Sequence, residues 1–256
     1  MLAPRTFCHP LLIGLALAAT CPPPAARAAD VPVDLELVLA VDISGSIDEA
    51  EAELQRRGYV AALSHPRVVE AIESGIIGRI AVIYVEWAGQ HSQRTVIDWT
   101  PIEDKATAGA FADAVAEAPM TTARWTSISG AIDYAATLFD GNGYEGMRQV
   151  IDVSGDGVNN SGRSAAAARD EAVAAGITIN GLPIVNDRLN PWGGLPPADL
   201  DRYYEEFVIG GPGAFIVVAE DFDRFASAIL SKLILEIAGT PPPDGGTRHA
   251  TLALVP

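Results

Sequence analysis

A near-continuous apolar run at residues 33–41, VDLELVLAV, ends in oxygen-bearing side chains at Asp42, Ser44 and Ser46. An apolar run of this kind is typical of a central parallel strand that is buried on both faces. Parallel strands need crossover connections, which are usually helices, and open parallel sheets bind ligands at the carboxyl ends of their strands. This segment therefore predicts an α/β domain with polar ligand groups at one strand end.

The rest of the chain alternates short apolar stretches with helical patterns. This alternation predicts a Rossmann-like, doubly wound and mostly parallel sheet that is flanked by helices. Residues 95–99 follow a strand closely enough to pair with it as a hairpin, so we expect one antiparallel edge strand. Further strands are expected at 79–87, 148–153, 177–184 and 214–218, and helices at 48–63, 103–118, 127–139, 164–175 and 222–237.

The first 28 residues have the pattern of a secretory signal peptide. They contain an early arginine, an apolar stretch too short to span a bilayer, and a small-x-small site at residues 26–28. We therefore expect an exported protein, either periplasmic or secreted. A lipid-modified Cys21 is the alternative reading of this leader. No later stretch is long and apolar enough to predict a transmembrane helix.

After the leader, one α/β domain of residues 29–239 is expected, followed by a disordered tail at 240–256 that begins with prolines and glycines. Residues 185–213 are too long for a simple connection, so we expect an insertion loop there. The net charge of −16 would repel phosphate backbones, which argues against nucleic acid as a partner.

Three predicted loops at one edge of the sheet carry oxygen donors. One follows the first strand, one opens the helix in WTSISGAIDYA, and one follows the strand in VIDVSGDG. Oxygen donors without histidine or cysteine suit a hard cation, so Mg²⁺ is expected, with Mn²⁺ or Ca²⁺ as possible substitutes. The candidate metal ligands are Asp42, Ser44, Ser46, Thr126 and Asp156. The alternative is that the two serines only cap the following helix.

These motifs resemble the von Willebrand factor type A (vWA) domain and its metal-ion-dependent adhesion site (MIDAS). The resemblance rests on the DxSxS at the strand end, the distant TxxxGAI and the Asp-Gly after an apolar strand, and it covers about residues 33–237. One departure is that Gly155 stands where the family usually has a threonine before the aspartate. The insertion makes the chain look more like the exported bacterial branch of the family, which is largely of unknown function.

The resemblance implies a metal-dependent protein-binding domain rather than an enzyme. A Glu or Asp carboxylate of the partner protein would complete the coordination of the ion. Aromatic side chains dominate interface hot spots, so Trp125 and Trp192 are expected on the rim that contacts the partner.

Two other functions use the same residues. A metal-assisted hydrolase would need a general base near the ion, for which Asp48, Glu86 and Asp152 are the candidates by sequence. A structural subunit of a cell-envelope assembly would use the metal only to stabilise the edge of the sheet. An EF-hand calcium loop is excluded because Ile47 stands where that loop requires glycine, and a strand precedes it.

Overall fold

The protein is represented by a computed structural model that describes residues 29–185, 195–221 and 224–239. The expected signal peptide at 1–28, the expected tail at 240–256 and Trp192 all lie outside these ranges. Within them, no helix is both long and apolar enough to cross a membrane.

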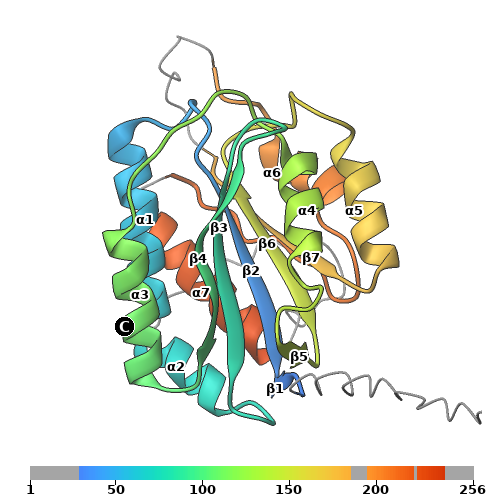
Figure 1. Cartoon of the computed structure of the whole chain (residues 1–256). Helices are drawn as coiled ribbons and strands as arrows, with labels where there is room; N and C mark the ends of the chain where they lie inside the picture. Colours follow the sequence, from blue (N-terminus) through green and yellow to red (C-terminus); the bar gives the residue numbers. More distant parts are fainter. Residues whose placement is uncertain (1–28, 186–194, 222–223, 240–256) are drawn as a thin grey trace, which may run out of the picture.

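A five-stranded sheet forms the centre of the molecule (Figure 1). Its strand order is β4-β3-β2-β6-β7, in which β3, β2, β6 and β7 run parallel and β4 pairs antiparallel with β3. This arrangement confirms the predicted fold class, including the antiparallel edge strand. The strands are β2 (Leu35–Asp42), β3 (Ile80–Trp87), β4 (Gln93–Ile102), β6 (Gln149–Gly155) and β7 (Thr178–Pro183).

Helices cover both faces of the sheet, which explains why β2 is apolar at nearly every position (Figure 1). Leu37 and Leu39 enter one core, whereas Val38 and Ala40 enter the other, because successive side chains of a strand point to opposite faces. The helices on the side of the first core are α1 (Glu49–Leu63), α2 (Pro66–Glu73), α3 (Lys105–Glu117) and α7 (Phe225–Ala238). The helices on the side of the second core are α4 (Ile128–Thr137), α5 (Ala165–Ala174), α6 (Leu200–Tyr203) and the π-helix η1 (Tyr204–Val208).

The strand expected at 214–218 does not form a regular ladder. It runs beside β7 and makes only isolated bridges, Gly181↔Ile216 and Ile184↔Ala219. The physical reason is Pro183, which has no N–H, so one hydrogen bond of an otherwise regular parallel ladder is missing. Helix α2 was also not predicted, nor were the helical turns at 200–208 within the expected insertion, nor the small parallel pair of β1 (Val31–Val33) with β5 (Tyr144–Gly146).

Neighbouring strands β2 and β6 lead to opposite faces of the sheet. The chain continues from β2 into α1 on the first face and from β6 into α5 on the second. Their carboxyl ends lie side by side, with Val41 paired to Ser154. This is the switch point at which open α/β sheets bind ligands, and it is where the predicted oxygen donors gather.

Candidate metal centre

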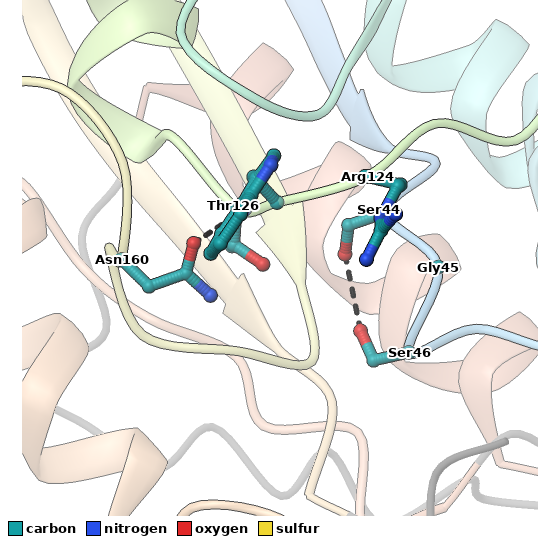
Figure 2. A pocket seen from close by; sticks show the side chains of 7 residues that line it. Ser44, Gly45, Ser46, Arg124, Thr126 and Asn160 are labelled. Atoms are coloured by element: carbon teal, nitrogen blue, oxygen red, sulfur yellow. Dashed lines mark hydrogen bonds between the residues drawn. The ribbon is translucent and has the colours of Figure 1, made fainter. Parts of the chain in front are cut away.

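The loop after β2 is held by hydrogen bonds among its own polar groups. Asp42 is the last residue of the strand and is completely buried. Its Oδ1 accepts a hydrogen bond from the Ser44 backbone N–H at 2.7 Å. The hydroxyl oxygens of Ser44 and Ser46 lie 3.1 Å apart (Figure 2). The DxSxS spacing therefore brings two hydroxyls and a carboxylate into one turn.

Asp156 lies just past β6 and is joined directly to this turn. The Ser46 hydroxyl donates a hydrogen bond of 2.7 Å to Asp156 Oδ1, although the two residues are 110 positions apart in the sequence. Asp156 is buried with 5% of its surface exposed. The second predicted acid thus lies on the same small cluster as the first.

Thr126 reaches the cluster from a third segment, immediately before the α4 N-cap residue Ser127. Its backbone N–H donates to Asn160 Oδ1 at 2.8 Å, and its carbonyl accepts from the Asn160 N–H at 2.8 Å (Figure 2). A side-chain carbon on Gly157 would stand 3.5 Å from Thr126 Oγ1, so the threonine lies against the turn that carries Asp156. All five predicted ligands are therefore brought together.

A cavity of about 290 Å³ opens over these residues. Its walls come from the loop after β2 and from the segment before α4, with a contribution from the loop after β6. Figure 2 shows the hydroxyls of Ser44 and Ser46 together on one side and Thr126 with Asn160 on the other. The residues that line the cavity are Ser44, Gly45, Ser46, Arg124, Trp125, Thr126 and Asn160.

The electrostatics of the two acids suit a bound cation. Burial raises the pKa of Asp42 well above its ordinary value, and the nearby Asp156 raises it further. Burial also raises the pKa of Asp156, to about 6, against the lowering effect of the Ser46 hydrogen bond. Asp42 Oδ2 is buried and has no hydrogen-bond partner. Two buried carboxylates with a free oxygen and neutral hydroxyls beside them fit a hard divalent cation.

This donor set differs from sites built by histidine, cysteine or many acids. In the part of the chain that the structure describes, no three His, Cys, Asp or Glu residues gather closely enough to hold a metal ion. The centre instead combines two carboxylates with hydroxyl oxygens. Such a set supplies at most two negative charges, which balance a divalent ion without exceeding its charge.

Sequence reasoning missed Tyr204, which lies against this centre. Tyr204 begins η1 and is completely buried, and its hydroxyl has no hydrogen-bond partner. Burial raises its pKa well above the ordinary value, and the charges of Asp42 and Asp156 are the next causes. The one local signal was the glycine at position 155, but a glycine does not reveal which distant side chain fills the space.

Glu86 holds the segment that leads to Thr126. This buried carboxylate lies 2.6 Å from a guanidinium nitrogen of Arg56 and 2.6 Å from one of Arg94. Arg56 also donates to the carbonyl of Ala118, and Arg94 donates to that of Pro119 at 3.2 Å. The two arginines therefore connect Glu86 to the backbone at the start of the segment.

Farther along the same segment, the Ala123 N–H donates to the Ile43 carbonyl at 3.1 Å, and the Ser127 N–H donates to the Ala88 carbonyl at 2.7 Å. The backbone around Thr126 is thus fixed from both sides. This accounts for how a threonine outside the sheet reaches the two acids at the strand ends.

The three acids considered as general bases all have other partners. Asp48 caps α1 by accepting from the Glu51 N–H at 2.9 Å. Glu86 is paired with two arginines, as described above. Asp152 is completely buried on β6, and its Oδ1 lies 2.6 Å from the ammonium nitrogen of Lys232 on α7.

Trp125 is the predicted rim residue that the structure describes, and it borders the cavity. Its side chain is 63% exposed, and its backbone has φ of 70°, in the left-handed region that bulky residues rarely adopt. Arg124 is also exposed. Among the described residues that line the cavity, it is the one with a charged side chain, and that charge is positive.

Solved structures with this fold are vWA-type proteins. They include proximal thread matrix protein 1 (PTMP1) from the mussel byssus, with 13% identity and a TM-score of 0.59 over 82% of this chain and 49% of that one. BatB from Bacteroides thetaiotaomicron has 20% identity and a TM-score of 0.54 over 80% and 100% of the chains. A von Willebrand factor type A protein from Catenulispora acidiphila has 13% identity and a TM-score of 0.52 over 80% and 42%.

PTMP1 has also been solved with a zinc-occupied MIDAS motif, in a structure with 13% identity and a TM-score of 0.57 to this chain. The present chain spans about half the length of PTMP1. At these identities the likeness establishes the fold. No curated protein matches the sequence.

The sequence model of one protein family, described as a protein of unknown function, matches residues 32–241. That range covers the whole sheet, every helix described above and all five candidate ligands. The chain has the vWA fold and belongs to the DUF1194 family.

Proposed function

We propose that this protein is a metal-dependent protein-binding domain. A divalent cation, with Mg²⁺ expected, would be held by Asp42, Ser44, Ser46, Thr126 and Asp156. A Glu or Asp side chain of a partner protein would then complete its coordination. The observation that carries this proposal is the unpaired, buried Oδ2 of Asp42 within a cluster of oxygen donors that borders an open cavity.

The donor set explains why the bound ion would attract a partner. Hydroxyls coordinate without adding negative charge, so the protein's two carboxylates only balance a divalent ion, and an external carboxylate can still bind it. A carboxylate bound in this partly buried place makes a charge-assisted contact that is stronger than the same contact in water. The cavity beside Ser44 and Thr126 gives such a side chain room to approach.

The contacts of the three candidate bases favour binding over hydrolysis. Asp48 is used as a helix cap, and Glu86 and Asp152 are paired with buried cations. A general base must be free to take a proton from a metal-bound water. The hydrolase therefore stays the second candidate, and the structural subunit of an envelope assembly the third.

Export is part of the proposal and rests on the expected signal peptide. The periplasm or the outside of the cell would be the place where a partner protein is met. Fractionation of cells that express the full chain, followed by N-terminal sequencing of the purified protein, tests both the destination and the cleavage site near residue 28.

Isothermal titration calorimetry of Mg²⁺, Mn²⁺, Ca²⁺ and Zn²⁺ into the metal-free protein tests the site. We expect saturable binding that is lost in Asp42→Ala and Asp156→Ala. The exposed Asp113 on α3 gives a matched control, because Asp113→Ala removes one negative charge away from the site. Unchanged binding in Asp42→Ala, together with an unchanged fold by circular dichroism, would contradict the proposal.

The predicted partner carboxylate can be tested before any partner is known. In the Mn²⁺-loaded protein, water proton relaxation reports the waters on the ion. Sodium acetate should lower this relaxation by replacing a water, whereas sodium chloride at equal ionic strength should not. Equal effects of the two salts would contradict carboxylate binding and favour the structural-subunit alternative.

A further inference from the structure

Two buried polar atoms without hydrogen-bond partners lie beside Gly155. They are Asp42 Oδ2, at the end of β2, and the hydroxyl oxygen of Tyr204, at the start of η1. Both residues are completely buried. Leaving a buried polar group unpaired costs about 1–3 kcal/mol, so two such atoms at one place need an explanation.

The space between them is shaped by the absence of a side chain. A side-chain carbon on Gly155 would stand 2.8 Å from Asp42 Oδ2 and 3.0 Å from the Tyr204 hydroxyl oxygen. Both atoms therefore surround the same point, and a larger residue at position 155 would have to displace them.

A second glycine accommodates the ring of the same tyrosine. A side-chain carbon on Gly181, in the adjacent strand β7, would stand 2.6 Å from Tyr204 Cδ1. The neighbouring strands β6 and β7 thus each have a glycine where Tyr204 packs against them. The slot that these two glycines form directs the phenol of Tyr204, which comes from η1 outside the sheet, towards Asp42.

We propose that Tyr204 is a further member of the metal centre, whose hydroxyl donates a hydrogen bond to Asp42 Oδ2 when a cation is bound there. This inference rests on the proposed metal-binding function. The phenol then orients the carboxylate by adding a hydrogen bond to Oδ2, which accepts none in the structure. Hydrogen-bonding partners of metal ligands typically contribute about 10–100-fold to metal affinity.

The role predicts opposite effects on stability and on metal affinity. In Tyr204→Phe the ring that fills the slot stays, while the unpaired hydroxyl is lost. The metal-free variant should therefore unfold at the same temperature as the wild type or a higher one. Its Mn²⁺ affinity, measured by calorimetry, should fall about tenfold, and metal should raise its melting temperature less.

Tyr59 supplies the matched control, because it is equally buried and its hydroxyl donates to Ser154 Oγ at 3.0 Å. Tyr59→Phe removes a satisfied hydrogen bond, so the metal-free variant should melt at a lower temperature. Its affinity for Mn²⁺ should stay at the wild-type value.

The outcomes separate this inference from the function on which it rests. If wild-type protein and Tyr204→Phe bind Mn²⁺ equally well, the role of Tyr204 is overturned and the metal site stands. A lower melting temperature of metal-free Tyr204→Phe with unchanged affinity would overturn it too, by assigning the hydroxyl to the fold alone. If the wild type binds no metal, the proposed function itself fails, and this inference with it.

Discussion

The hydroxyl of Ser46 donates a hydrogen bond of 2.7 Å to Asp156 and so joins the loop after β2 to the loop after β6. The contact spans 110 residues of sequence and crosses the switch point of the sheet. It also lowers the pKa of Asp156, against the larger raising effect of burial. One hydroxyl thus helps to hold the two acidic loops together.

Replacing this hydroxyl should weaken metal binding without unfolding the protein. Ser46→Ala removes both a candidate ligand and the contact with Asp156, so we expect Mn²⁺ affinity to fall by at least about tenfold in calorimetry. Ser74→Ala is the control, because its hydroxyl is exposed and donates only to the Glu70 carbonyl at 2.6 Å. Equal affinities of Ser46→Ala and Ser74→Ala would remove Ser46 from the site.

Glu86→Gln should affect both stability and the metal site. The substitution leaves the buried Arg56 without its anionic partner, so the free energy of unfolding should fall by about 3 kcal/mol in urea denaturation. The segment before Thr126 should loosen, and Mn²⁺ affinity should fall with it. Glu103→Gln is the control, because its ion pair with Arg79 is exposed and should contribute at most about 1 kcal/mol. A stability loss without any change in affinity would show that Glu86 does not position Thr126.

Stability should depend on pH through a buried charge cluster that links the sheet to α7. Asp152 lies beside Lys232 and Glu236, all three are buried, and Tyr59 lies nearby on α1. Burial, followed by the charge of Glu236, raises the pKa of Asp152 from 3.8 to about 7, although Lys232 lowers it. The folded protein therefore binds this proton more tightly than the unfolded chain does.

The sign of the pH dependence follows from this tighter proton binding in the folded state. The stabilising contribution is complete below the unfolded pKa of Asp152, near 3.8, and is lost as the pH rises through about 7. Asp152→Asn should flatten the pH dependence of the unfolding free energy across this window, whereas Asp133→Asn, at an exposed ion pair, should leave its slope unchanged. An identical slope in wild type and Asp152→Asn would contradict the assignment.

Lys232→Met tests the same cluster from the other side. It leaves two buried carboxyl groups without their cation, so the loss of stability should be large, about 3–5 kcal/mol, at neutral pH. The loss should become smaller at acidic pH, where the carboxyl groups are protonated. Urea denaturation at both pH values measures it, and a loss that is independent of pH would argue against an electrostatic origin.

Arg124 should favour partners that present more than one acidic group. The guanidinium lines the same cavity as Ser44 and Thr126, so a second carboxylate near the first has a cation to meet. In the Mn²⁺-loaded protein, succinate should bind more tightly than acetate, and Arg124→Gln should abolish that preference while Mn²⁺ affinity is retained. Arg67→Gln, at an exposed position on α2, is the control. A preference for succinate that survives in Arg124→Gln would exclude this role.

The sequence by itself determined the fold class and the strand-end position of the candidate ligands. Apolar residues at nearly every position of 35–41 can be buried only in a strand covered on both sides, which requires helices on both faces. The groups that follow such a strand must lie at its carboxyl end. The spacing of Asp42, Ser44 and Ser46 likewise acts within one turn, where local geometry decides which atoms meet.

Only the tertiary structure decided which distant side chains complete this edge of the sheet. Nothing in the local pattern placed Tyr204 beside Asp42, or Arg56 and Arg94 beside Glu86. The missing N–H of Pro183 was visible in the sequence, but its consequence depended on which segment runs alongside it. Periodicity and turn chemistry are properties of neighbouring residues, whereas these contacts depend on how segments far apart in the chain pack against one another.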